Sequence, residues 1–442
     1  MCAILSAARR REPVAKPSRG PELPSRSRMV IAEIGSRRAE GAGYSHVDLG
    51  DSTRVALVIT PRGRGAFRDQ AREVLATMRV VLEKQPEPMV VTVQTVFLKD
   101  TRDQAECEQL FAEFSGAKLP VTNYVMQAPC GGAALALEAW AIGGKSVRVE
   151  RFGSHALAVA YDGVRWVYCA GVKPAASGEG VYPQALDALG RLGAALAEAG
   201  SSFERVVRTW FYLGGITEPE AEVQRYQELN RARTEFYRDI RFHCSSLAPK
   251  APRGVYPAST GIGMAGGGLV ASCLALETRR DDVFLLPLEN PLQTPAYAYD
   301  PKYSCQSPKF SRAVALGLGD YVTTWVSGTA SIVGSESCHP SDPEKQTEQT
   351  IDNIERLIGA ENFTRHGLKG AGASLRDLAK IRVYLKRPED LAKCRAICGR
   401  RLGAVPAIYA VADICRPELL VEIEGVAFSR YQNSDLCQRR KP

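Results

Sequence analysis

The feature that most constrains this fold is a pattern that occurs three times along the chain. A strand-like segment, at residues 89–100, 204–215 and 378–388, is followed each time by a polar helix and by a closing pair of strands that begins near a proline. A further strand and a long helix precede each copy. Because an overlooked repeat leads to the wrong fold, any architecture for this chain must contain three similar units of unequal length.

Each unit is expected to read strand, strand, helix, strand, helix, strand, strand. Apolar residues at helical spacing predict two helices in each unit, at 67–85 and 103–116, at 182–200 and 221–237, and at 345–358 and 389–403. This combination of helices and strands indicates the α+β class, with the helices on one face of a mixed sheet.

Length and charge exclude several classes of protein. The 442 residues are enough for three units of roughly 150, and no apolar run approaches the ~20 residues that span a bilayer. Residues 1–28 hold seven Arg or Lys and two Glu, and so supply +5 of the formal net charge of +8. The remaining charge is too small to suggest a nucleic-acid partner. We expect residues 1–43 to form a disordered basic extension, with a transit peptide as the alternative.

Cysteine, histidine and glycine patterns argue against a cofactor. The twelve cysteines include no CxxC pair, the five histidines include no HExxH motif, and Cys394 and Cys398 are expected to pack on one helix face. Scattered thiols without a secretory signal favour the cytoplasm. The glycine-rich segment 264–270 is expected to be a hairpin, and it lacks the Lys-Ser/Thr of a phosphate loop. We therefore expect no metal, no nucleotide and no other cofactor.

The three copies differ most informatively in their last strand. When the copies are aligned on a shared glutamate, only the third places a second carboxylate two residues earlier: Glu422 precedes Glu424, where the others have Ala136 before Glu138 and Ala275 before Glu277. Strand alternation puts Glu422 and Glu424 on one face and Val421 and Ile423 on the other, under the helices. Desolvation and a like charge both raise a carboxyl pKa, so Glu422 is the candidate proton donor and Glu424 is expected to be structural. A solvated edge or a structural ion pair is the alternative for Glu422.

These segments carry a resemblance to known families. The repeat unit, with FSRAVAL (310–316), the SG of WVSGTASI (325–332) and VEIE (421–424), resembles the Rid/YjgF family of reactive-intermediate deaminases, which are homotrimers with clefts between subunits. The three-copy version, with 290–313, 348–358 and 412–425, resembles the chorismatase family over nearly all of the chain from about residue 44.

The resemblance implies a fold and a set of boundaries. It implies three Rid/YjgF-like (chorismate-mutase-like) modules that form a pseudo-trimer with a central β-barrel and outer helices. The expected parts are the extension at 1–43, a degenerate module at 44–150, a second module at 151–288, a third at 289–430 with the catalytic acid, and a loose tail at 431–442. Because a fused trimer needs no partner to complete itself, we expect a monomer or a weak homo-oligomer.

The resemblance also implies a reaction on chorismate without a cofactor. Glu422, at the family's acid position, would protonate the enolpyruvyl methylene. A ring hydroxyl would then displace pyruvate through an arene-oxide-like intermediate that becomes 3-hydroxybenzoate. Whether 4-hydroxybenzoate accompanies it stays open. Protonation of the methylene gives an oxocarbenium ion. In the hydrolytic branch of the family, water captures this ion and gives a dihydroxycyclohexadienoate.

Two further positions select between these outcomes in the family. One is Gly328, where the hydrolytic branch tends to carry alanine, and the other is Cys415. Together they resemble the branch that makes hydroxybenzoate. Physically, glycine lets a substrate ring lie close to the backbone, and a thiol is a weak donor and acceptor. From the residues alone, Cys415 would be read as a small buried hydrophobe.

A dianionic substrate requires cations, and arginine binds carboxylates with paired hydrogen bonds. The candidates are Arg231 and Arg233, of which only one is expected to face the cleft, together with Arg382 and Arg395. Arg382 stands where the other copies have Thr95 and Trp210. Tyr299 lies where the family places a substrate-contacting tyrosine, and an interface aromatic is its alternative. The site is expected between the second and third copies.

Two other functions stay open at the level of sequence. The first is an imine or enamine deaminase, but the arginine that such enzymes carry after Pro-Ala is here Ile408. The second is a non-catalytic ligand-binding scaffold, since two of the three clefts lack an acid at the position of Glu422.

Overall fold

The computed structural model describes residues 35–39, 42–175, 180–243, 255–300 and 306–431. Within these residues the chain forms three six-stranded sheets, one for each copy of the repeat. The first contains β1 (Gly35–Ala39), β2 (Ala42–Asp48), β3 (Thr53–Ile59), β4 (Met89–Leu98), β5 (Val121–Val125) and β6 (Leu135–Gly143). The second contains β7 (Arg148–Phe152), β8 (Ala156–Tyr161), β9 (Val164–Val172), β10 (Val206–Gly214), β13 (Ala258–Met264) and β14 (Leu269–Thr278). The third contains β15 (Phe284–Leu288), β16 (Ala313–Leu318), β17 (Tyr321–Ala330), β20 (Leu378–Leu385), β21 (Ala407–Val411) and β22 (Val421–Arg430).

The three sheets have the same strand order. It is β1-β2-β3-β6-β4-β5 in the first, β7-β8-β9-β14-β10-β13 in the second and β15-β16-β17-β22-β20-β21 in the third. In each sheet only the last pair is parallel. The strand after the first long helix also has an irregularity at the same place in every copy, between Val91 and Val93, Val206 and Arg208, and Leu378 and Lys380.

Two long helices accompany each sheet, close to the predicted ranges. They are α1 (Phe67–Glu83) and α2 (Gln104–Ser115), α3 (Val181–Glu198) and α4 (Arg225–Phe236), and α5 (Pro343–Ile358) and α7 (Leu391–Leu402), with the short α6 (Ala360–Arg365) added in the third unit. The helix α4 begins later than predicted because Pro219–Glu220 and Val223–Gln224 form a small ribbon, β11 and β12. A second ribbon pairs β18 (Ile332–Val333) with β19 (Glu336–Ser337). No helix within the described ranges is long and apolar enough to cross a membrane.

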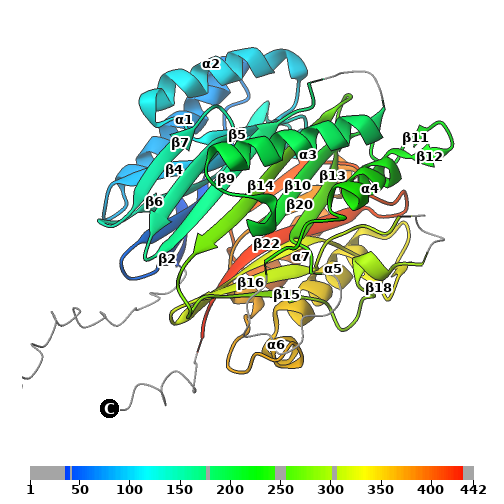
Figure 1. Cartoon of the computed structure of the whole chain (residues 1–442). Helices are drawn as coiled ribbons and strands as arrows, with labels where there is room; N and C mark the ends of the chain where they lie inside the picture. Colours follow the sequence, from blue (N-terminus) through cyan, green and yellow to red (C-terminus); the bar gives the residue numbers. More distant parts are fainter. Residues whose placement is uncertain (1–34, 40–41, 176–179, 244–254, 301–305, 432–442) are drawn as a thin grey trace, which may run out of the picture.

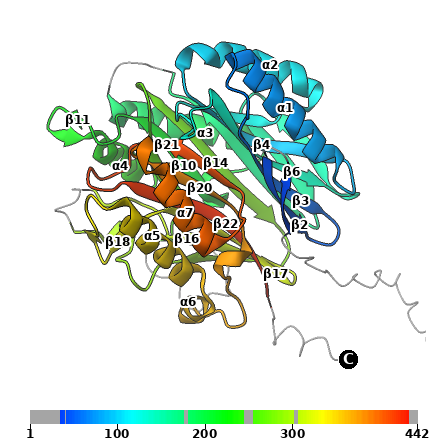
Figure 2. The same cartoon turned by 180° about the vertical axis from the view of Figure 1, so that it is seen from behind.

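The helices lie on the outside and the strands of the three units meet in the middle (Figures 1 and 2). Each sheet buries one face under its own helices, as where Val421 and Ile423 pack with Ile351 of α5 and Ile397 of α7. Cys394 and Cys398 belong to the same core, as expected. The opposite faces of all three sheets share a common core that includes Val47, Trp166, Leu274, Trp325 and Phe428. The predicted α+β arrangement is therefore present.

Several finer expectations differ from the structure. Each of the three sheets is open in the described part of the chain, so the expected central β-barrel is not a closed one. The strand β1 and the start of β2 lie inside the extension expected at 1–43, of which 1–34 and 40–41 are outside the described residues. The strand β15 pairs with β16, so the third sheet begins before residue 289. The segment 264–270 is not a hairpin, because β10 lies between the strands that it joins.

The strand register corrects the alignment of the repeat. Thr95 pairs with Glu138 and Arg382 with Glu424, while the equivalent Trp210 pairs with Ser272. The second copy therefore has Ser272, not Glu277, at the shared glutamate position. By the same register, Glu422 corresponds to Ala136 and to Val270 rather than Ala275. Glu277 lies further along β14 and pairs with Arg165 at 3.4 Å.

Candidate active site

A cavity of about 240 Å³ lies between the second and third sheets, at the place where the sequence predicts a cleft. Helix α4 and strand β13 supply one wall, and β17, β22 and the loop after β21 supply the other. The lining residues are Gln224, Tyr226, Gln227, Asn230, Ser259, Gly261, Tyr299, Pro308, Phe310, Arg312, Gly328, Ala330, Ile332, Cys415, Arg416, Pro417, Glu418 and Glu422.

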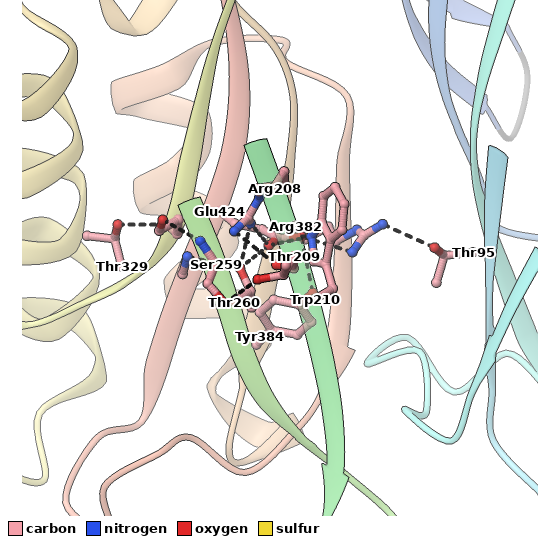
Figure 3. Close-up of polar contacts among 12 residues, drawn as sticks. Thr95, Arg208, Thr209, Trp210, Ser259, Thr260, Thr329, Arg382, Tyr384 and Glu424 are labelled. Atoms are coloured by element: carbon pink, nitrogen blue, oxygen red, sulfur yellow. Dashed lines mark hydrogen bonds and ion pairs between the residues drawn. The ribbon is translucent and has the colours of Figure 1, made fainter. Parts of the chain in front are cut away.

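Side-chain hydrogen bonds join the two sheets behind the cavity. The hydroxyl of Ser327 accepts from the backbone N–H of Ser259 at 2.9 Å, and the hydroxyl of Thr260 accepts from the backbone N–H of Gly328 at 2.9 Å. Both bonds cross from β17 of the third sheet to β13 of the second, in the region drawn in Figure 3. These two bonds hold the backbone of β17 in place around Gly328.

Glu422 faces the cavity from the middle of the third sheet. It lies on β22 between Ala330 of β17 and Tyr384 of β20, and its side chain is buried. Among the described residues, no side chain or backbone group forms a hydrogen bond or ion pair with its carboxyl group. A Cβ atom at Gly328 would lie well inside contact distance of a Glu422 carboxyl oxygen. The glycine therefore provides the space that the carboxyl group occupies.

Burial raises the pKa of Glu422 to about 8, and the negative charge of Glu424 acts in the same direction. Arg208 and Arg312 oppose this shift without cancelling it. The two causes expected from the sequence thus both act on this group. At neutral pH Glu422 is a carboxylic acid that carries a proton next to a cavity.

Glu424, two residues along the same strand, is in the opposite state. Burial acts to raise its pKa, but Arg382 and Arg208 outweigh burial and hold the pKa below its ordinary value. The ion pairs to Arg382 and Arg208 measure 2.9 and 2.6 Å (Figure 3). Two neighbouring acids whose environments push their pKa values apart are typical of an acid site with a fixed charge beside it.

Two arginines that are not among the predicted site residues, Arg312 and Arg416, line the cavity. Arg312 is buried and donates to the backbone oxygen of Thr294 at 3.0 Å and to the hydroxyl of Tyr299. Arg416 lies over the ring of Tyr299 at 5.2 Å and donates to the backbone oxygen of Ser335 at 2.9 Å. By the strand register, the positions equivalent to Arg312 are Gly43 in the first unit and His155 in the second. Arg382 is a predicted site residue because it is a permanent positive charge at a position where the other two copies have none. The same criterion applies to Arg312 and would have identified it.

Four predicted residues, Glu422, Gly328, Cys415 and Tyr299, line the same cavity. Arg233 is buried directly behind it and donates to Ser259 Oγ at 3.2 Å and Asn230 Oδ1 at 2.6 Å, both from lining residues. Burial, with help from the Glu422 charge, raises the pKa of Cys415 to about 12, so that group is a thiol at neutral pH.

Three predicted arginines lie outside this cavity. For Arg382 and Arg395 this corrects the expected place in the substrate site, whereas for Arg231 it is compatible with the expectation that only one of Arg231 and Arg233 faces the cleft. Arg231 points away, pairs with Glu228 at 2.9 Å and covers the ring of Tyr182. Arg395 covers Tyr409 in the cleft between the third and first units. Arg382 is buried in the centre of the molecule, because its long side chain crosses to Thr95 and Glu138 of the first sheet (Figure 3).

Clefts also lie at the other two junctions between units. One, of about 420 Å³, contains Val58 and Thr60 of the first unit beside Arg395 of the third. The other, of about 790 Å³, contains Val270 of the second unit beside Gln104 of the first. The positions equivalent to Glu422 are Ala136 in the first unit and Val270 in the second, and Val270 lines the larger of these two clefts. Only the junction of the second and third units combines a neutral buried acid with buried arginines in the described part of the chain.

Comparison with known proteins places this arrangement in a family. Residues 138–275 match the family model described as Chorismatase FkbO/Hyg5-like, N-terminal. A 3-hydroxybenzoate synthase from Streptomyces hygroscopicus is 35% identical over 298 residues, which are 65% of this chain and 80% of that protein. A chorismatase from Streptomyces rapamycinicus is 36% identical over 308 residues, which are 65% of this chain and 81% of that protein.

One solved structure agrees in fold, and a further sequence match covers a shorter segment. A solved chorismatase structure superposes with a TM-score of 0.61 at 23% identity, over 85% of this chain and 98% of that structure. A RutC family protein from Pyrococcus abyssi is 30% identical over 89 residues, which are 20% of this chain and 62% of that protein. Because this chain covers about four fifths of the length of two relatives that are more than 30% identical to it, it belongs to the chorismatase family.

Proposed function

We propose that this protein converts chorismate to 3-hydroxybenzoate and pyruvate. The observation that carries the proposal is the buried Glu422 carboxyl group, which faces the cavity and keeps its proton at neutral pH. The enol ether of chorismate becomes a leaving group only when its methylene carbon is protonated. A neutral acid in a desolvated site can transfer that proton, whereas an ionised one cannot.

The proposed sequence balances without any added reactant. The Glu422 proton is transferred to the methylene carbon, and the enol ether becomes an oxocarbenium ion. The neighbouring ring hydroxyl then forms a C–O bond to the ring carbon that carries the ether and loses its proton, while the ether bond breaks and pyruvate leaves. Opening of the resulting arene oxide and loss of a ring proton give the aromatic product and allow Glu422 to be protonated again. No water, metal or nucleotide is consumed.

The arginines are proposed to bind the two carboxylates of the substrate. Arg312 and Arg416 both line the cavity, and Arg233 supports its wall through Ser259 and Asn230. Tyr299 lies between Arg312 and Arg416 and is proposed to orient both guanidinium groups. Bidentate guanidinium contacts would hold the ring in one orientation.

Gly328 and Cys415 are proposed to direct the intermediate towards the aromatic product. Gly328 allows the acid to lie against the strand, and Cys415 presents a neutral thiol as a weak donor near the ring. Hydrolysis to the dihydroxycyclohexadienoate is the second candidate outcome, because it needs the same protonation step and differs only in what captures the cation.

We also propose that the three sheets with their helices are three Rid/YjgF-like modules arranged as a pseudo-trimer. The identical strand order of the three sheets supports this. Such a chain completes its own clefts, so we propose a monomer or weak homo-oligomer that works in the cytoplasm.

The test is incubation of the purified chain with chorismate, without metal or nucleotide, and separation of the products by chromatography. We expect 3-hydroxybenzoate and pyruvate in equal amounts. The variant Glu422→Gln should lower pyruvate release by about 10³-fold, within the usual range for a general acid, and remain folded. Glu418→Gln is the matched control, because it changes another carboxyl group of the same cavity and should keep most of the activity. Full activity of Glu422→Gln would remove this residue from the mechanism.

A further inference from the structure

A second, smaller cavity of about 50 Å³ lies where the three sheets meet. It is separate from the proposed active site, since the two share no lining residue. All three units contribute to its lining. The residues are Arg54, Val93, Gln94, Thr95, Asn123, Glu138 and Trp140 of the first unit, Tyr168, Cys169, Trp210, Ser272, Cys273 and Leu274 of the second, and Trp325, Lys380, Arg382, Val426 and Phe428 of the third. A water molecule needs at least ~10–15 Å³, so this space suits a few waters or one small ion.

Buried charges around this cavity are out of balance. Three cations, Arg54, Lys380 and Arg382, line it, and the carboxylate that lines it is Glu138. Glu138 accepts hydrogen bonds from Lys380 and Arg382, and Arg382 also pairs with Glu424 at 2.9 Å. Glu424 in turn is shared with a fourth buried cation, Arg208, at 2.6 Å (Figure 3). Four cations thus face two carboxylates in this buried centre of the described chain.

Among the described residues, Arg54 is the cation of this centre that forms no ion pair with a carboxylate. Its side chain is buried, and its polar neighbours are tyrosine hydroxyls: that of Tyr168 at 3.5 Å and that of Tyr161. The faces of Tyr161 and Trp166 lie 5.5 and 5.3 Å from its guanidinium carbon. Aromatic faces attract a cation but do not neutralise it. A buried charge is normally paired, so this one indicates a missing negative partner.

The repeat shows where that partner belongs. The register aligns Ser272 with Glu138 and Glu424, so two of the three equivalent positions hold a carboxylate and the third holds a hydroxyl group. Ser272 is 2% exposed and lines the cavity, and its hydroxyl group has no hydrogen-bond partner in the described part of the chain. A free hydroxyl beside excess cations is a suitable donor to an anion.

We propose that the cavity binds one small monovalent inorganic anion, of the size of chloride, beside Ser272. The anion supplies the third negative charge of the pseudo-threefold set and offsets Arg54 and Lys380. It stabilises the junction of the three units and takes no part in the reaction, which keeps this proposal independent of the proposed function. A dicarboxylate such as chorismate is far too large for this space.

The experiment uses the full chain, exchanged into sodium gluconate at neutral pH, because gluconate is too large for the cavity. Sodium chloride then replaces gluconate at constant ionic strength while the midpoint of thermal unfolding is followed. We expect a saturable rise of several degrees, reproduced by bromide. Crystals grown in bromide should show an anomalous peak between Arg54, Lys380 and Ser272. Equal midpoints in chloride and gluconate, with no peak in the cavity, would overturn the proposal.

A variant makes the test sharper. Ser272→Asp places a fixed carboxylate at the third position, as in the other two units. We expect this variant to lose the chloride response and to be as stable in gluconate as the unmodified chain is in chloride. Thr209→Val, a change outside the cavity lining, is the control that should keep the response. An undiminished chloride response in a folded Ser272→Asp variant would contradict the assigned position. If that variant does not fold, the chloride titration and the bromide crystals of the unmodified chain decide whether the cavity binds an anion.

Discussion

At the scale of single residues, Glu422 and Glu424 show how neighbours with the same chemistry acquire opposite states. Both are buried on one strand. Glu424 lies within ion-pair distance of Arg208 and Arg382. Glu422 faces a cavity, and the neighbouring residue on β17 is Gly328, which has no side chain to contact its carboxyl group. The charge of Glu424 also raises the pKa of Glu422. The structural acid therefore helps to keep the proposed catalytic acid protonated.

The pH dependence of the reaction follows from this raised pKa. With a folded-state pKa of about 8, Glu422 is protonated below that pH and ionised above it. Initial rates of pyruvate release should be nearly constant from pH 6 to 7, begin to fall towards pH 8, and then fall towards tenfold per pH unit above about 8. Lys380, whose pKa burial lowers to about 8, titrates in the same range. Lys380→Met is therefore the control. If this variant is folded and active, its rate should show the same decline above pH 8, because Glu422 and not Lys380 causes it. A rate that rises through pH 8 would exclude an acid role for Glu422.

Gly328 provides a second test at this scale. A methyl group there would overlap a carboxyl oxygen of Glu422, so Gly328→Ala should displace the acid rather than unfold the sheet. We expect pyruvate release to fall about tenfold, equivalent to a loss of ~1.4 kcal/mol of transition-state stabilisation. The share of dihydroxycyclohexadienoate should rise, as measured by chromatography of the products. Gly261→Ala in the opposite wall is a useful comparison, because its Cβ would meet the ring of Tyr226 and not the acid. An unchanged rate and product ratio in Gly328→Ala would contradict this account.

At the scale of elements, the junction of β13 and β17 holds the second and third sheets together. The Thr260 hydroxyl donates to Glu424 and accepts from Arg208 and from the backbone of Gly328 (Figure 3). One side chain thus links the central ion pairs to the strand that carries the cavity.

Removal of that hydroxyl should be costly. Thr260→Val should lower the free energy of unfolding by about 3 kcal/mol, because it leaves buried charged groups and one N–H without a partner. Thr209→Val removes a single neutral bond to Ser259 at 2.9 Å and should cost about 1 kcal/mol. Urea unfolding of both variants gives the comparison. Equal stability of the two would show that the junction contributes no more than an ordinary hydrogen bond.

At the scale of the whole molecule, one chain contains three similar junctions, and their chemistry differs. The positions equivalent to Glu422 are Ala136 and Val270, and neither can donate a proton. Within the described residues, the three junctions between units therefore have one cleft each, and one of these clefts is the proposed catalytic site.

Binding stoichiometry tests this asymmetry. The variant Glu422→Gln should bind chorismate without rapid turnover, and isothermal titration should give one site per chain. Arg312→Met should abolish that binding, because it removes a buried guanidinium from the cavity wall. Arg395→Met, which alters the cleft between the third and first units, should leave it unchanged. Two or three equivalent sites per chain would show that the other junctions bind substrate as well.

The sequence by itself determined the repeat with its helices and strands, and it singled out Glu422 as the candidate acid. Hydrophobic periodicity is a local property, so the predicted helices lie within a few residues of those observed, except where a ribbon delays α4. The difference between copies selected Glu422 because a strand position that is apolar in two units and acidic in the third is visible without coordinates.

Only the tertiary structure decided which arginines reach the cavity and how the three sheets align. An arginine side chain is long enough to cross from one sheet to another, so Arg382 joins the centre while Arg312 and Arg416 line the site. Strand register depends on pairing and on an irregularity in each sheet, which is why Ser272 and not Glu277 occupies the third glutamate position. Burial and charge balance arise from contacts between residues far apart in the chain, and these also set the pKa of Glu422.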